Sequence, residues 1–381
     1  MWHHTKTGSR LMFSVRRIRQ ESEFSNLETT WNNLLKQSCA DNPFLTWQWL
    51  YSWWKCYGQK SELMILALEK DEQVVALAPL MVRTKPLGLL KAREIVFLGS
   101  FGAGSDYLDF IITKGFETSS IEVIITHLAR NDRAWDVISL TNIPDGSASI
   151  DHVKKACNKI GYCHTGNPSV VCPLIQLPST WDEYLSTLSK SMRSDIRRKN
   201  NKLSKIGDVE YEVIQERRDL DSAMNDLIHL NRLRMKTKNL QGAFLDSQFT
   251  QFHKNLISLF FQNEILHLSF LKVNGKRIAA LYNFFYNDVC FYYQSGFDPV
   301  RAKFSPGTVL FTLSIREAIN SGMREYDFLQ GDESYKFNWA NAKRQCFSIF
   351  VYNKTFIGSL LYTSFLLKSH LKKTLSPASQ F

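Results

Sequence analysis

Hydrophobic residues recur at steps of three and four along residues 26–58, as they do on the buried face of a helix. This spacing predicts two helices, broken near Asp41-Asn42-Pro43. Residues 62–84 predict two strands instead, joined by a charged turn from Glu69 to Gln73. The rest of the first half predicts strand–loop–strand, helix and strand, in that order, at residues 93–112, 121–130 and 135–144.

The second half of the chain repeats this order of elements. Its patterns predict helices, then three strands, then a helix and a last strand, at residues 180–207, 219–239, 246–263, 264–298, 306–323 and 324–330. Asn274-Gly275 is a strong type I′ hairpin signal within the strand region. Pro306 and Gly322 stand where a helix prefers to begin and end. The fold class that we expect is therefore α/β, with an internal duplication whose boundary lies near residues 166–173.

This order divides the chain into an N-terminal unit (12–166), a C-terminal unit (167–365) and a basic tail (366–381). We expect Met12 to lie nearer the true start than Met1, because the preceding residues show no apolar pattern. Residues 356–368, FIGSLLYTSFLLK, are too few for a membrane span. They predict a terminal helix that either packs on the body of the protein or lies on a membrane surface.

Composition narrows the class of partner without choosing one. The chain has 381 residues and a formal net charge of +11, which favours phosphates, cofactor pyrophosphates, nucleic acid or an anionic membrane face. Its seven cysteines form no CxxC pair, so we expect neither a disulfide framework nor a zinc site. A reducing cytoplasm fits this cysteine usage, and no metal is expected.

A basic loop precedes the helix predicted at residues 306–323. Arg301 and Lys303 lie just before Ser305-Pro306-Gly307-Thr308, where free N–H groups at a helix start suit a phosphate. In the alternative interpretation, Ser305 caps the helix and Pro306 occupies its first turn. That alternative leaves the two basic residues unexplained.

The segment YDFLQGDESYKFNWA, residues 326–340, places charges directly after an apolar strand. Lys336 is suited to stabilise a developing oxyanion or to hold a phosphate, and Asp332 is suited to accept a proton. The alternative is a solvated turn, which is the usual environment of a lysine.

Two further segments carry candidate binding residues. Residues 190–205 hold seven basic residues, among them Arg193 and Arg197, and one acid, which predicts either a polyanion-binding helix or a solvated basic face. Asp106 and Asp109 follow a glycine-rich stretch and belong either to a cleft or to a plain polar loop. The glycines there do not form a dinucleotide fingerprint, and the chain has no GxSxG, GxxxxGK[ST] or HRD-type motif.

Residues 267–339 resemble the GNAT superfamily of acyltransferases. More narrowly, they resemble the CelD-like group of cellulose and exopolysaccharide biosynthesis, which is related to the FemAB peptidyltransferases. The residues that carry the resemblance are Tyr292-Tyr293, Ser295-Gly296, Asp298, Ser305-Pro306-Gly307, Gly322, Tyr326-Asp327-Phe328-Leu329, Gly331, Tyr335-Lys336 and Trp339. The first half matches more loosely, through residues 42–54, 78–81 and 97–110.

The resemblance implies two tandem GNAT-like units, the first of them degenerate, each with a mixed central sheet flanked by helices. It implies transfer of an acyl group, from acyl-CoA, to an amine of a sugar, peptide or cell-envelope precursor. The segment before the helix departs from the usual glycine-rich CoA signature, which keeps two alternatives open. These are an aminoacyl-tRNA donor, held by the basic helix at residues 190–205, and a non-catalytic accessory role in exopolysaccharide assembly.

The resemblance and the charge pattern together give the expected site. The predicted catalytic residues are Lys336, Asp332 and Tyr335. Those for the donor phosphate are Arg301, Lys303, Ser305, Gly307 and Thr308, and those for the substrate are Tyr293, Asp106, Asp109, Arg193 and Arg197. We expect no DNA partner, and a cytoplasmic protein with peripheral contact to the membrane or to the envelope-synthesis machinery.

Overall fold

The computed structural model describes residues 13–131, 135–237, 241–331 and 333–374, so Met12 and Asp332 lie outside the described residues. The first unit begins with a strand and helices that precede a three-stranded antiparallel meander. Its elements are β1 (Ser14–Ile18), α1 (Glu21–Ser25), α2 (Glu28–Lys36), η1 (Pro43–Leu45), α3 (Trp47–Tyr57), η2 (Gly58–Lys60), β2 (Glu62–Lys70), β3 (Gln73–Leu87), β4 (Leu90–Phe97), β5 (Ile111–Ile112), α4 (Glu117–Asn131), β6 (Val137–Pro144) and α5 (Ser149–Ile160).

From strand β8 on, the second unit follows the first unit's order of strand, helices, antiparallel strands, helix and strand, with two α-helices after its opening strand where the first unit has three. Its elements are α6 (Trp181–Thr187), α7 (Lys190–Leu203), β8 (Val209–Val213), η3 (Arg217–Asp219), α8 (Leu220–Thr237), η4 (Ala243–Leu245), α9 (Ser247–Gln262), β9 (Leu266–Val273), β10 (Lys276–Tyr286), β11 (Val289–Phe297), η5 (Pro299–Phe304), α10 (Pro306–Asn320), β12 (Glu325–Asp327) and α11 (Ser334–Phe337). The predicted internal duplication of an α/β unit is confirmed.

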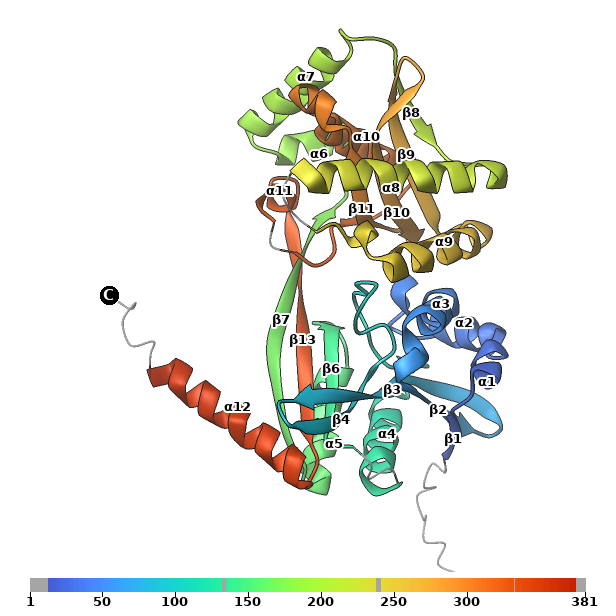
Figure 1. The fold of residues 1–381 in the computed structure, drawn as a ribbon, viewed down its shortest axis with the longest axis vertical. Helices are drawn as coiled ribbons and strands as arrows, with labels where there is room; N and C mark the ends of the chain where they lie inside the picture. Colours follow the sequence, from blue (N-terminus) through green and yellow to red (C-terminus); the bar gives the residue numbers. More distant parts are fainter. Residues whose placement is uncertain (1–12, 132–134, 238–240, 332, 375–381) are drawn as a thin grey trace, which may run out of the picture.

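Two long strands, β7 (Cys163–Gln176) and β13 (Ala342–Tyr352), run between the units (Figure 1). In the described residues the strand order is β1-β2-β3-β4-β6-β13-β7-β12-β11-β10-β9-β8, with β5 beside β3. Strand β13 pairs with β6, and the end of β7 pairs with β12. The two strands therefore join the strands of both units into one 13-stranded sheet. The division at residues 166 and 167 stays a prediction, since β7 continues through it.

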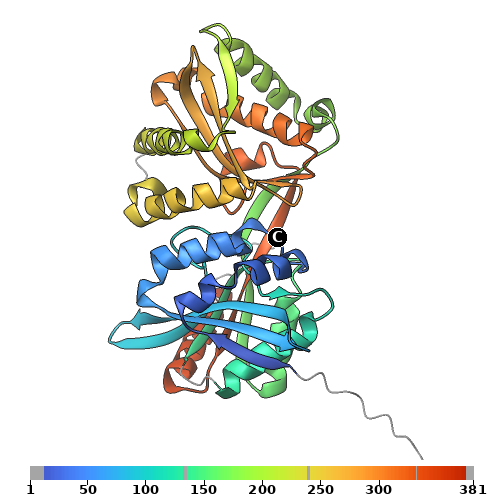
Figure 2. The same cartoon turned by 90° about the vertical axis from the view of Figure 1, so that its right-hand side faces the viewer.

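The helices cover the second unit's sheet on both faces. Helices α8 and α9 pack on one face, and α7 and α10 lie on the other (Figure 2). Helix α9 also packs on α3 of the first unit, where Trp49 contacts Phe252 and Phe260. One hydrophobic core thus runs from the first unit into the α8–α9 face of the second unit, and this contact fixes the two units against each other.

Several local predictions are confirmed and others need correction. Asn274 and Gly275 both have positive φ, at 51° and 74°, as a type I′ turn requires. The helix expected over residues 180–207 is two helices, because Ser189 Oγ accepts a hydrogen bond from Met192 N–H and so caps the start of α7. The strand expected over residues 324–330 is only Glu325–Asp327.

The last described element is helix α12 (Phe356–Thr374), which includes the first residues of the predicted basic tail. Residues 375–381 of that tail lie outside the described residues. Among the helices of the described ranges, none is both long and apolar enough to cross a membrane.

Candidate active site

Strands β11 and β12 run parallel but stay paired over only three residues each, Val289–Phe291 and Glu325–Asp327. Beyond this point β11 continues along β10 as far as Phe297. Strand β12 ends instead, and the chain turns at Leu329, whose φ is +57°. The backbones therefore diverge, and the segments that follow the two strands carry most of the predicted site residues.

Lys336 lies on the short helix α11 and is almost fully buried, with a side chain that is 5% exposed. Its Nζ donates to the carbonyl oxygen of Gln330 at 2.7 Å and lies 3.0 Å from Glu333 Oε2. The interpretation of Lys336 as a solvated turn residue is therefore wrong. A buried ammonium group costs desolvation energy unless it is paired, so these two oxygens hold it in place.

Asp106 reaches the same segment from the first unit. It is 1% exposed, and its Oδ2 accepts a hydrogen bond from Gln330 N–H at 3.3 Å. Its Oδ1 is buried and has no hydrogen-bond partner among the described residues. Burial raises the pKa of Asp106 to about 7, against the opposing effects of the Gln330 N–H and of Lys336. The alternative of a plain, solvated polar loop does not fit this burial.

A second group of polar side chains surrounds Tyr335. Its hydroxyl lies 3.4 Å from that of Tyr292, which lies 2.7 Å from Ser295 Oγ. Arg234 of α8 donates to Ser295 Oγ, and its guanidinium lies 5.9 Å from the ring centre of Phe297. Burial opposes the charge of Arg234, but the Tyr292 and Tyr335 hydroxyls outweigh it and raise its pKa. The Arg234 cation therefore lies beside Tyr335, one of the predicted catalytic residues.

Asp327 ties the first unit's loop to strand β12. Its buried Oδ2 accepts hydrogen bonds from Tyr107 OH and from Arg344, both at 2.7 Å, and its Oδ1 accepts one from Leu329 N–H. Arg344 also binds Glu325 at 2.9 Å. Burial raises the pKa of Asp327 to about 6, although Arg344 opposes the shift. These contacts place Asp106, the neighbour of Tyr107, beside Gln330.

The start of α10 meets the basic helix α7. Ser305 has φ +54° and makes no capping hydrogen bond with its side chain, so the capping alternative is wrong for this residue. Lys199 Nζ donates to Thr308 Oγ1 at 3.3 Å, and Lys202 Nζ donates to the carbonyl oxygen of Lys303 at 2.7 Å. Two basic segments that appear separate in the sequence thus form one basic surface.

The rest of α7 divides into engaged and open positions. Arg193 donates to the carbonyl oxygen of Leu188 at 2.6 Å and so binds the C-terminal end of α6. Arg198 pairs with Asp195. A shallow hollow on the outer face is lined by Ser194, Arg197, Arg198, Asn201, Lys202 and Lys205. Arg197 therefore belongs to an open basic surface, and Arg193 holds two helices together.

Tyr293 and Asp109 lie apart from Lys336. The Tyr293 hydroxyl donates to the carbonyl oxygen of Ala103 and lies 3.1 Å from His253 Nε2, between the first unit's loop and α9. Asp109 accepts hydrogen bonds from Ser147 and Ser149, and burial raises its pKa to about 6. Tyr293 thus joins the two units. Asp109 faces a cavity that Lys336 does not line.

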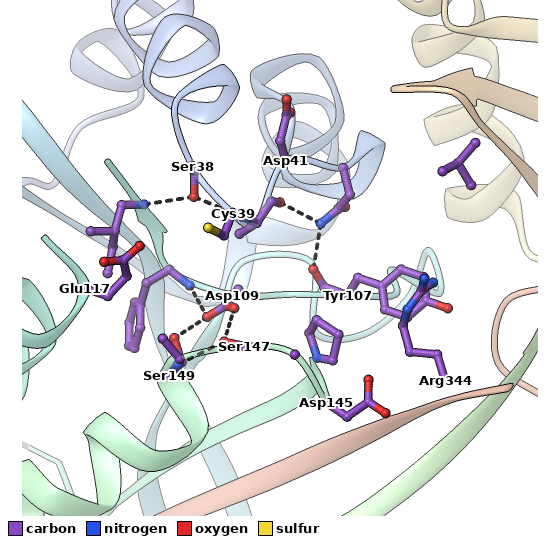
Figure 3. Close-up of a pocket in the computed structure, with 18 of the residues that line it drawn as sticks. Ser38, Cys39, Asp41, Tyr107, Asp109, Glu117, Asp145, Ser147, Ser149 and Arg344 are labelled. Carbon is purple, nitrogen blue, oxygen red and sulfur yellow. Dashed lines mark hydrogen bonds between the residues drawn. The ribbon is translucent and has the colours of Figure 1, made fainter. Parts of the chain in front are cut away.

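That cavity has a volume of about 390 Å³ and is lined by residues of both units (Figure 3). Its carboxylates are Asp41, Asp109, Glu117, Asp145 and Glu325. Arg344 also lines the cavity, but its guanidinium forms ion pairs with Asp327 and Glu325. Glu117, at the start of α4, lines this cavity. Helix α4 corresponds in element order to α10, whose start meets Lys199 of α7. The negative charge of the cavity's carboxylates suits a positively charged amine better than a phosphate.

The structure brings Lys336 and Asp106 together at Gln330, and it places Tyr335 in the group of Tyr292 and Arg234. It joins Lys303 and Thr308 to the lysines of α7. Arg301 lies beside them on η5, and a Cβ at Gly307 would meet only Phe297, at 3.6 Å. Sequence reasoning missed Arg234, which sits within an ordinary amphipathic helix, and it missed the Tyr107–Asp327–Arg344 contacts, which join distant segments. Within the described ranges, no group of three or more His, Cys, Asp or Glu side chains is placed to hold a metal ion.

Comparison with known proteins matches part of the chain to a family. Residues 190–337 match the family described as an acetyltransferase (GNAT) domain. The matched segment covers less than half of the chain and includes α7, the start of α10 and Lys336. No curated protein matches the chain.

Two solved structures share the fold over nearly the whole chain. The structure of FemX is 11% identical with a TM-score of 0.60, and the match covers 92% of this chain and 99% of FemX. The C-terminal domain of a putative lysylphosphatidylglycerol synthetase from Agrobacterium fabrum is 12% identical with a TM-score of 0.52, covering 91% of this chain and 98% of that one. The chain is therefore an acyltransferase whose second unit carries a GNAT domain, within a two-unit fold similar to that of FemX.

Proposed function

We propose that the protein is an N-acyltransferase that moves an acyl group from acyl-CoA to an amine of a sugar, peptide or cell-envelope precursor. The observation that carries this proposal is the convergence of the buried Lys336 ammonium and the buried Asp106 carboxyl on Gln330. A positive charge and a proton acceptor held close together, away from water, are what acyl transfer to an amine requires. The fold that the chain shares with a putative lysylphosphatidylglycerol synthetase supports an acceptor from the envelope.

In the proposed reaction, the acceptor nitrogen attacks the donor's carbonyl carbon and forms the new C–N bond. The carbonyl electron pair moves onto oxygen, and Lys336 stabilises that oxyanion. Asp106, whose pKa of about 7 suits a base at neutral pH, accepts the proton lost by the nitrogen. Collapse of the intermediate breaks the C–S bond and releases the CoA thiolate, which takes up a proton.

Other predicted residues take supporting roles in this proposal. Tyr335 orders the polar group that contains Arg234, and Asp332 takes part in acceptor binding or in proton removal. Arg301, Lys303, Ser305, Gly307 and Thr308 hold the donor phosphates, with Lys199 and Lys202 of α7 beside them. Asp109 and the acidic cavity bind a part of the acceptor that does not carry the reacting amine. Tyr293 holds the first unit's loop in place.

A second donor is favoured by a specific observation. The open basic face of α7, with Arg197 and Lys205, continues the basic surface at the start of α10. An aminoacyl-tRNA would place its phosphates along such a face and its ester near Lys336. The proposed function also includes membership of the CelD-like group, with an acceptor used in exopolysaccharide assembly. It includes a location on the cytoplasmic side of the membrane. The division into units at residues 166 and 167 is proposed with it.

The test is a thermal-unfolding screen of the full chain against CoA, acyl-CoAs and charged tRNA, followed by turnover with amine acceptors. A ligand at 100 times its Kd stabilises the folded state by about 2.7 kcal/mol, which is readily measured. Stabilisation by CoA and release of free thiol with an amine present would support the main proposal. Salt-sensitive stabilisation by tRNA would favour the second donor, and binding without any turnover would favour an accessory protein.

A further inference from the structure

Helix α12 projects away from the first unit, and its first turns contact the body (Figure 1). The Tyr362 ring lies 5.2 Å from that of Tyr352 in β13. Thr355 Oγ1 donates to Asp136 Oδ1 at 2.7 Å and accepts from Gly358 N–H at 3.0 Å. Gly358 packs so closely that a Cβ there would lie 2.3 Å from the carbonyl oxygen of Asn353. The direction of the helix is therefore fixed at its base, although most of its length extends from the body.

A stripe of exposed apolar side chains runs along this helix. The exposed fractions are 78% for Phe356, 43% for Leu360, 62% for Leu367 and 59% for Leu371. Their spacing of four, seven and four residues puts them on one side of a helix. At 1.5 Å per residue the stripe is about 22 Å long. Apolar side chains exposed over this length, with Thr363 among them, are unusual on a surface that faces only water.

The charge of the segment indicates what covers this stripe. Residues 356–381 contain Lys368, Lys372 and Lys373 and no aspartate or glutamate. A second copy of the helix would bring like charges together. An anionic bilayer surface accepts the leucines among its acyl chains and attracts each nearby lysine by about 1 kcal/mol.

We propose that α12 lies in the headgroup layer of an anionic phospholipid membrane, with Phe356, Leu360 and Leu367 inserted toward the acyl chains. The helix lies in the plane of the membrane and does not span it. The fixed base at Thr355 and Gly358 then sets how the first unit faces the bilayer. This inference rests on α12 alone and does not depend on the acyl-transfer proposal.

The experiment is co-sedimentation of the full chain with phosphatidylcholine vesicles, with and without phosphatidylglycerol. We expect binding to the vesicles that contain phosphatidylglycerol. The double substitution Leu360→Ser, Leu367→Ser should lower the partition coefficient by roughly tenfold or more, because buried apolar area supplies much of the binding. The matched control is Leu245→Ser in η4, a leucine that is 59% exposed on the second unit and should leave binding unchanged.

A second variant separates the charge from the apolar stripe. Lys368→Gln with Lys372→Gln should weaken binding to phosphatidylglycerol vesicles and flatten its salt dependence. All substituted side chains except that of Lys372, which is not described, are exposed, and unchanged circular dichroism would show that the variants fold. Absence of binding to both kinds of vesicle would overturn the proposal. So would concentration-dependent dimers, without lipid, that the leucine substitutions abolish.

Discussion

Asp106 and Lys336 hold the two peptide groups of one residue, Gln330, from opposite units of the protein. Asp106 Oδ2 accepts from the Gln330 N–H at 3.3 Å, and Lys336 Nζ donates to the Gln330 carbonyl oxygen at 2.7 Å. The first unit therefore contributes a buried carboxyl to a segment whose lysine belongs to the second. This gives a physical reason for a chain with two units when only the second matches an acetyltransferase domain.

Replacement of Lys336 tests the central assignment. Lys336→Ala should lower kcat by roughly 10²–10³-fold, the range for loss of one oxyanion donor, while KM changes much less. Lys336→Arg keeps the charge with a different donor geometry and should restore activity only in part. Steady-state kinetics with the donor and acceptor found in the ligand screen give both values.

The control for Lys336 is Lys343→Ala, which removes an exposed lysine on the nearby strand β13. It should leave kcat unchanged. Lys336→Ala should also lower the free energy of unfolding by about 1–3 kcal/mol, because Glu333 and the Gln330 carbonyl lose a buried partner. Equal turnover by Lys336→Ala and the wild type would remove Lys336 from the site.

The sequence was most informative where the pattern is local. Helix and strand periodicity, and the Asn274-Gly275 turn, depend on neighbouring residues, so they predicted the elements and their duplication. Strands β7 and β13 were missed because their role depends on pairing across the whole chain. The polar beginning of β7, residues 163–170, has no alternating apolar pattern to mark it as a strand.

The candidate site divides in the same way. The pair Tyr335-Lys336 and the segment before α10 were predicted from motifs within one stretch of chain. The approach of Asp106 to Gln330 depends on how Tyr107 meets Asp327 and Arg344 in the folded protein, which no local spacing encodes. Arg193 shows the converse, because its basic spacing suggested ligand binding and its contact to Leu188 is structural.

The pH dependence of activity tests Asp106. Because its pKa is raised to about 7, kcat/KM should rise with pH through about 7 if the ionised carboxyl is the base. Asp106→Asn should lower the rate by roughly 10²–10⁴-fold and remove this limb of the profile. A profile that is the same in the variant would assign the proton transfer to another group.

Stability should depend on Asp106 in the opposite direction. A carboxyl with a folded-state pKa above its unfolded value binds its proton more tightly in the folded state. The stabilisation of the folded state by protonation of Asp106 is therefore fully present below about pH 4, and it is lost as the pH rises through about 7. Asp106→Asn should raise the melting temperature at pH 8 relative to the wild type, with a smaller difference at pH 4. The control Asp182→Asn, at an exposed carboxylate of α6, should show no such trend.

Arg234 is expected to bind an anionic group of a substrate. Its partners are neutral: it donates to the hydroxyl and to the carbonyl oxygen of Ser295, and the Tyr292 and Tyr335 hydroxyls lie beside it. Arg234→Gln should raise KM for the anionic substrate by roughly tenfold, as loss of one charge-assisted hydrogen bond implies. Arg316→Gln, at an exposed position on α10, is the matched control and should leave KM unchanged.

The glycine before α11 offers a test of where the Lys336 ammonium must lie. Gly331 has φ +136°, and a Cβ there would lie 2.6 Å from Lys336 Nζ and 2.1 Å from Glu333 Oε2. Both atoms are ends of flexible side chains, so in Gly331→Ala they would swing away and the fold would survive. We expect kcat to fall by roughly tenfold or more, because displacement by about 1 Å weakens a positioned group to that degree.

Gly322→Ala provides the control for this displacement. Gly322 also has a positive φ, +73°, but a Cβ there would meet nothing within 4 Å. Both substitutions carry the strain of a side chain at positive φ, about 1 kcal/mol, and only Gly331→Ala moves the ammonium group. Similar melting temperatures with a loss of kcat confined to Gly331→Ala would place the catalytic requirement at Lys336 Nζ. A loss of kcat that follows stability in both variants would attribute the effect to backbone strain, and the close contact between Gly331 and Lys336 would then have no catalytic meaning.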